Sequence, residues 1–139
     1  MNDPLPNDQP LAEPEVFVRL RQARHRMLQL HKLLLDAERA RYEQVHGAIA
    51  GGQLLQLVID DPQFAWLRSI SALIVRIDEM FDGEEPATAE QAEALAAEVR
   101  ELLQPDEAGS EFAQKYFAAL QADPDAVLAN RDIRQALQG

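Results

Sequence analysis

Apolar side chains recur every three or four residues along most of the chain, which is the spacing of one face of an α-helix. The longest such stripe consists of Val16, Leu20, Ala23, Met27, Leu30, Leu34 and Ala37, and it continues, slightly rotated, through Tyr42, Val45 and Ile49. The pattern predicts one long helix, or two coaxial helices, over residues 15–49. At ~1.5 Å per residue this helix spans roughly 50 Å, long enough to be the spine of a bundle or to leave one end for a partner.

The densest apolar run lies at residues 61–81 and predicts the central helix of the core. Asp61 and Pro62 are typical of a helix start, because an aspartate accepts backbone N–H groups at the N-cap and proline fits the first helical position. The apolar face consists of Trp66, Leu67, Ile70, Leu73, Ile74, Ile77, Met80 and Phe81, opposite Arg68, Ser69, Arg76 and Glu79. We expect Trp66 to be buried, with its indole N–H bonded to a nearby acceptor.

Shorter elements follow the same spacing. Gly47, Gly51 and Gly52 are expected to end the first helix, and residues 53–60 predict a short helix because no second strand is present to pair with them. Amphipathic helices are predicted over residues 89–103, capped by Thr88, and from Ser110 onward. Asp123 and Pro124 predict one or two short C-terminal helices, with Val127, Leu128, Ile133 and Leu137 as their contacts.

These elements predict an all-α, four-helix-bundle-like fold with a long N-terminal helix and short extra helices after it and at the C-terminus. Residues 1–13 hold three of the eight prolines and predict a disordered N-terminal arm. Residues 14–139 predict a single helical bundle domain.

Composition narrows the classes of function. The chain has no cysteine, which excludes disulfides, a thiol nucleophile and cysteine-ligated zinc. Neither a secretory signal nor an apolar run of ~20 residues is present, so we expect a cytoplasmic protein without a membrane segment. Residues 1–50 hold seven acidic and seven basic groups, so the whole net charge of −11 lies in residues 51–139. Nucleic acid is therefore an unlikely partner, since its affinity comes from phosphate neutralisation.

One basic cluster stands out against this acidity, at residues 19–26 of the first helix. We interpret it as a solvated face that attracts the acidic later helices. Binding of an acidic partner is the alternative hypothesis for this cluster.

A polar seam lies on the apolar side of the first helix. Arg24, His31 and Glu38 are seven residues apart, and buried charge is costly unless it is paired. One interpretation is a structural network paired with groups such as Arg76 or Asp78. The other is that the seam lines a cleft or a subunit interface, in which case Glu38→Gln would weaken binding and leave the melting temperature nearly unchanged.

Two further groups of side chains have the chemistry of a site. Arg68 and Arg76, two turns apart, can bind a carboxylate or phosphate, or pair with acids of a neighbouring helix. Glu43 and His46 form one Glu-x-x-His pattern, whereas di-metal bundles use two copies with two further glutamates. We therefore predict no metal site and no cofactor, and we find no catalytic arrangement.

The block from Asp61 to Glu79 and the later run KYFAALQADPDAVLANRDI resemble small all-helical bacterial proteins of an uncharacterised family. The resemblance covers the chain from about residue 15 and implies a bacterial, cytosolic, helical protein without implying an activity. The sequence predicts a non-enzymatic protein–protein interaction or regulatory module that forms a homodimer or binds another protein. The alternative is a small-molecule or metal-binding bundle, with or without enzymatic activity, that uses the polar seam.

Overall fold

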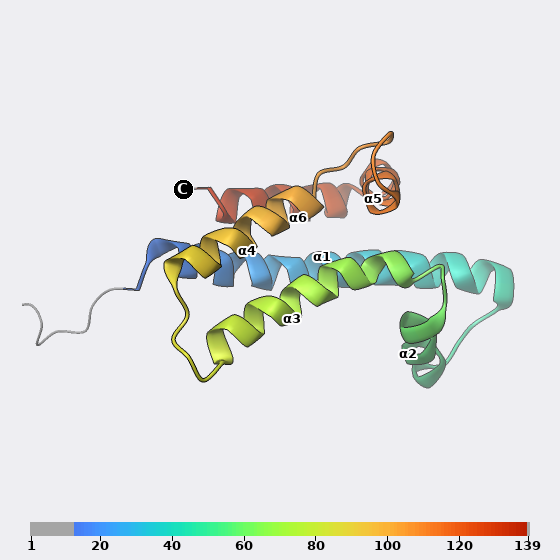
Figure 1. Ribbon diagram of the computed structural model, residues 1–139. Helices are drawn as coiled ribbons and strands as arrows, with labels where there is room; N and C mark the ends of the chain where they lie inside the picture. Colours follow the sequence, from blue (N-terminus) through green and yellow to red (C-terminus); the bar gives the residue numbers. More distant parts are fainter. Residues whose placement is uncertain (1–12, 139) are drawn as a thin grey trace, which may run out of the picture.

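The computed structural model describes residues 13–138, which form six α-helices and one short 3-10 helix without any β-strand (Figure 1). The elements are α1 (Glu15–His46), α2 (Gly51–Asp60), the 3-10 helix η2 (Ala65–Leu67), α3 (Arg68–Asp82), α4 (Ala89–Leu102), α5 (Glu111–Ala122) and α6 (Pro124–Ala136). The predicted all-α class is confirmed. The four-helix-bundle arrangement stays a prediction, and the predicted arm at residues 1–13 lies, except for Glu13, outside the described residues.

Helix α1 is the spine of the molecule. It runs through the middle of the structure, and α3, α4 and α6 pack along it, while α5 packs against α6 and η2 (Figure 1). The predicted stripe is buried from Val16 to Leu34, as its three-and-four spacing requires. Ala37, the last member of that stripe, is only half-buried, and the next buried position of α1 is the charged residue Glu38.

The start of the central helix differs from the prediction. Helix α3 begins at Arg68, because Asp61 accepts the backbone N–H of Gln63 at 2.8 Å and closes a turn, which η2 follows. Phe64, a residue of this turn that the helical pattern left out, is fully buried. The turn therefore contributes core side chains without being α-helical.

The junction of α1 and α2 also corrects the prediction. Helix α1 ends three residues early, at His46, where Gly47 adopts a φ of 86° that favours glycine. Gly51 and Gly52 do not end a helix; they form the first turn of α2, whose start is held by the Gln53 side chain accepting the N–H of Ala50 at 3.0 Å.

The glycine at position 52 yields a testable prediction. It has an ordinary helical backbone, and a Cβ built there meets no atom within 4 Å. Gly52→Ala should therefore stabilise the protein by roughly 0.4–1 kcal/mol, because alanine has fewer conformations than glycine in the unfolded chain. Urea unfolding measures this change, and Gly47→Ala, at a positive φ, is the control that should destabilise. A loss of stability in Gly52→Ala would contradict the helical assignment of this turn.

The predicted caps of the later helices are confirmed. The hydroxyl of Thr88 accepts the N–H of Gln91, and the Gln91 side chain accepts the N–H of Thr88, a reciprocal capping box. Ser110 caps α5, and Asp123 caps the single C-terminal helix α6. These contacts lie within three residues of each other, which is why the sequence pattern finds them.

The sequence predicts four apolar residues near the C-terminus as packing contacts, and the structure buries two of them. Ile133 and Leu137 are buried as expected, but Val127 and Leu128 are exposed on α6. Val45, predicted to continue the stripe of α1, is 77% exposed. The last turns of α1 lie at one end of the molecule, beside α2 and away from α4 (Figure 1).

Candidate functional site

The polar seam of α1 divides into separate contacts rather than forming one site. Arg24 donates two hydrogen bonds to Asp78 of α3, from Nε to Oδ1 at 2.5 Å and from Nη2 to Oδ2 at 3.0 Å. These hydrogen bonds raise the pKa of Arg24 above its ordinary value. Arg24 and Glu38 are about 21 Å apart along the helix axis at 1.5 Å per residue, so a small ligand does not contact both.

Glu38 is the buried charge of the described part of the chain, and only 7% of its surface is exposed. Its Oε1 accepts hydrogen bonds from the Arg41 guanidinium at 3.0 Å and the Trp66 indole N–H at 3.1 Å. Its Oε2 accepts one from the Gln63 amide at 2.9 Å. The Glu38 carboxylate thus connects the turn before α3 to the C-terminal half of α1. The buried tryptophan with a bonded N–H is confirmed.

The electrostatics of Glu38 follow from these contacts. Burial disfavours the charged form, but the hydrogen bonds of Arg41, Gln63 and Trp66 and the charge of Arg41 outweigh it, so the pKa of Glu38 lies below its ordinary value of 4.5. Glu38 therefore remains a carboxylate at neutral pH. An open pocket of about 470 Å³ lies beside it, with Arg41, Gln63 and Lys115 among its lining residues.

His31, the middle member of the seam, is half-buried between these two contacts along α1. Burial lowers the pKa of its imidazole below the ordinary value of 6.5, so the neutral form predominates at neutral pH. The structure does not bring His31 together with Arg24 or Glu38 around a common ligand position.

Arg68 and Arg76 of α3 have different partners. Arg76 forms a two-bond ion pair with Glu98 of α4, at 2.6 and 2.8 Å. The pair raises the pKa of Arg76 and lowers that of Glu98. Arg68 donates from Nε to the carbonyl of Val58 at 3.3 Å, which connects α3 to the end of α2. The pairing of Arg76 with a neighbouring acidic helix agrees with one of the two interpretations of the sequence.

Glu43 and His46 contact different groups of the protein. Glu43 accepts the backbone N–H of Ile49 at 2.9 Å, and the His46 ring stacks on Tyr42 with centroids 4.2 Å apart. Arg39 donates to the carbonyl of the same Ile49 at 2.9 Å. Glu43 and Arg39 thus hold the loop between α1 and α2. Within residues 13–138, no group of three or more acidic or histidine side chains is placed to hold a metal ion.

Helix α2 presents an apolar face that the rest of the described chain does not cover. None of its ten residues is buried, and Leu54, Leu57 and Val58 are only partly buried against the core. Leu55 and Ile59, one helical turn apart, are 63% and 54% exposed. We call the exposed side chains of Leu55 and Ile59 the α2 face. Helix α2 lies at the same end of the molecule as the last turns of α1 (Figure 1).

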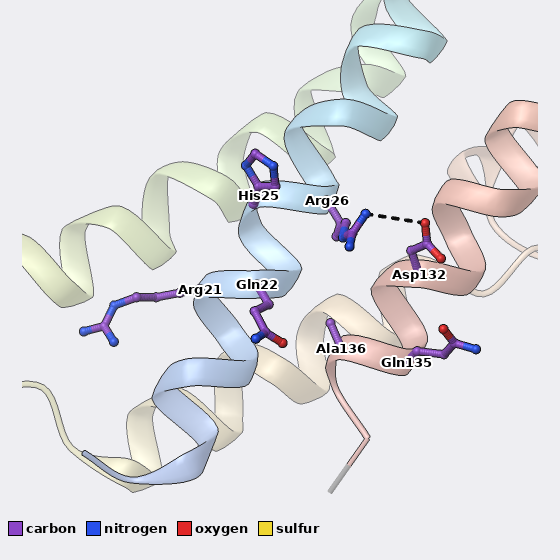
Figure 2. Close-up of a pocket in the computed structure, with 7 residues that line it drawn as sticks. All are labelled: Arg21, Gln22, His25, Arg26, Asp132, Gln135 and Ala136. Atoms are coloured by element: carbon purple, nitrogen blue, oxygen red, sulfur yellow. Dashed lines mark ion pairs between the residues drawn. The ribbon is translucent and has the colours of Figure 1, made fainter. Parts of the chain in front are cut away.

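A groove of about 580 Å³ lies between α1 and α6, at some distance from α2. It is lined by Arg21, Gln22, His25, Arg26, Asp132, Gln135 and Ala136. Figure 2 shows Arg26 of α1 and Asp132 of α6 reaching toward each other, whereas Arg21 points away from α6. We call this feature the α1–α6 groove.

Sequence reasoning missed two features of these sites. Gln63 and Arg41 bind Glu38. Arg41 has the i,i+3 spacing of a helical ion pair, which the sequence shows, whereas no sequence pattern indicates Gln63 as a partner. The α2 face was predicted only as a short helix, although its residues at positions 55 and 59 share one side at the spacing of four. That spacing shows which residues share a face, but it does not show whether another element covers them.

Comparison of the chain with protein-family models, curated protein sequences and solved structures finds no match. Among the described residues, no helix combines the length and the apolar character that crossing a membrane requires.

Proposed function

We propose that this protein is a non-enzymatic protein–protein interaction module that associates with a second copy of itself through the α2 face. The observation that carries the proposal is the exposure of Leu55 and Ile59 on a helix that has no buried residue. An exposed apolar patch on an ordered element is a typical mark of an interaction site.

The length of α2 supports this proposal. An isolated helix shorter than about 12–15 residues is marginal in water, and its stability comes from packing. Helix α2 has ten residues and packs through one side only. A partner that covers the opposite side would supply the burial that the chain itself does not.

The position of α2 is already set in the single chain. Arg39 and Glu43 bind Ile49 before it, and Arg68 binds the Val58 carbonyl at its end. A surface held in place loses less conformational freedom on binding, which favours association.

Charge favours a second copy as the partner. The chain carries a net charge of −11, yet residues 39–60 hold only Arg39, Arg41, Glu43 and Asp60, which balance. Two copies that meet through this segment therefore keep their acidic surfaces apart, and like-charge repulsion is small at the contact. A cytoplasmic, bacterial setting, expected from the sequence, belongs to the same proposal.

Substitution in the α2 face tests the proposal. We expect the wild-type protein to self-associate at micromolar concentration, and Leu55→Asp to weaken this association at least about tenfold, because a carboxylate is costly to bury in an apolar contact. Sedimentation equilibrium measures both. Leu128→Asp is the matched control, since Leu128 is a comparably exposed leucine on α6, and it should leave the association unchanged.

Two results would overturn the proposal. One is a wild-type protein that stays monomeric across the concentration range. The other is an equal loss of association in Leu55→Asp and Leu128→Asp, which would place the contact elsewhere or reflect only the added charge. Circular dichroism of both variants establishes that each is folded.

A further inference from the structure

The positive charge of this acidic protein is concentrated on α1. That helix holds seven arginine and lysine residues against four acidic ones, although the whole chain carries −11. Four of the seven, at positions 19, 21, 24 and 26, fall within eight residues that contain no acid. Two arginines of this cluster, Arg21 and Arg26, line the α1–α6 groove.

The arginines of this cluster differ in how completely their guanidinium groups are paired within the protein. Arg24 is bound by Asp78. Arg21 donates to both carboxylate oxygens of Glu13 at 2.6 and 2.8 Å and lies over the ring of Phe81, with 4.4 Å from its guanidinium carbon to the ring centroid. These contacts hold both side chains in structural roles.

Arg26 is only loosely paired. Its Nη1 lies 3.6 Å from Oδ2 of Asp132, which is too far for a hydrogen bond. The other oxygen of Asp132 accepts a hydrogen bond from Arg131 at 3.4 Å. The side chain of Arg26 is about half exposed and extends over the groove (Figure 2). The N–H groups of its guanidinium can therefore donate hydrogen bonds to a carboxylate of a partner.

The remaining lining of the groove suits a polypeptide. Gln22 from α1 and Gln135 from α6 line the groove and are exposed. Each primary amide offers both donors and an acceptor, as a peptide backbone requires.

We propose that the α1–α6 groove binds an acidic segment of another protein. Arg26 binds a side-chain carboxylate of that segment, a pairing that arginine favours through two parallel hydrogen bonds, and Gln22 and Gln135 bind its backbone. The carboxylate of the segment competes with Asp132, which lies 3.6 Å from Arg26 in the protein alone. This site is independent of the α2 face, which is apolar and lies on different elements.

Fluorescence anisotropy with the full-length protein tests the proposal, using a fluorescein-labelled octaglutamate peptide as the probe and octalysine as the opposite-charge control. We expect octaglutamate to bind, and binding to fade as NaCl rises from about 50 to about 500 mM because salt screens exposed charges. Arg26→Glu should weaken binding at least about tenfold. Lys32→Glu reverses the same charge on α1 at a side chain that is 77% exposed and outside the groove lining, and it should weaken binding no more than about twofold.

Several results would overturn the proposal: no octaglutamate binding, equal weakening by Arg26→Glu and Lys32→Glu, or tighter binding of a labelled oligothymidylate than of octaglutamate. A loss of self-association in Arg26→Glu would show that a second copy occupies the groove, and would also overturn it. Arg26→Gln, which removes the charge without reversing it, carries the test if Arg26→Glu fails to fold, and it should also weaken binding.

Discussion

Glu38→Ala should destabilise the protein by about 3 kcal/mol, since a buried donor left without an acceptor costs roughly 1–3 kcal/mol. The substitution removes the acceptor of the Trp66 indole and of the Gln63 amide, both of which hold the turn before α3. The Arg41 side chain is half exposed, so it replaces its lost hydrogen bond with one to water. For a chain of this length the melting temperature should fall by roughly 10 °C, which thermal unfolding followed by circular dichroism measures.

Two matched substitutions isolate the cause. Glu38→Gln keeps an acceptor for Trp66, so it should cost only about 1 kcal/mol. Glu98→Ala removes an exposed ion pair with Arg76, and the melting temperature should hardly change because exposed pairs contribute little. If Glu38→Ala is as mild as Glu98→Ala, the carboxylate does not hold the turn. If Glu38→Gln changes binding of a partner without changing stability, the seam is functional rather than structural.

The pH dependence of the same variant supplies a second measurement. Because the pKa of Glu38 is lower in the folded protein than its ordinary value of 4.5, its contribution to stability is complete above pH 4.5 and is lost as the pH falls through the folded-state pKa. The difference in unfolding free energy between wild type and Glu38→Gln should therefore shrink as the pH falls below 4.5. A difference that stays constant or grows would contradict the assignment of a buried carboxylate.

Phe64→Ala should destabilise the protein by about 3–5 kcal/mol, the usual cost of truncating a buried phenylalanine. The ring is fully buried, and its centroid lies 6.0 Å from that of Tyr42 on α1. Truncation leaves a cavity where the turn meets the spine. Urea unfolding measures the loss, and Val75→Ala, at an exposed apolar position of α3, should change stability little.

The outcome distinguishes two accounts of the segment before α3. If the turn is part of the core, the loss in Phe64→Ala matches that of truncating a helical core residue such as Ile70, which is also fully buried. A loss as small as that of Val75→Ala would mean that the turn is peripheral and that Glu38 binds it without a packing role.

Part of the candidate site was visible in the sequence. The seven-residue spacing of Arg24, His31 and Glu38 indicated charge on the inner side of α1, and Asp78 was one of the partners offered for it; Asp78 does bind Arg24. The partners of Glu38 were not predicted. Arg41 lies only three residues away, but Gln63 and Trp66 lie 25 and 28 residues away in the chain, and no local pattern encodes which groups such a turn brings to one carboxylate.

The sequence by itself determined that the described chain folds into helices and where several of them begin. Apolar spacing is a property of consecutive residues, and the caps at Thr88, Ser110 and Asp123 are contacts within one helical turn. These signals need no knowledge of the rest of the fold.

Only the tertiary structure decided that Phe64 is core and that Leu55 and Ile59 remain uncovered. The physical reason is common to both. Burial and hydrogen bonding depend on which distant element lies opposite a side chain, whereas periodicity reports only which side chains share a face.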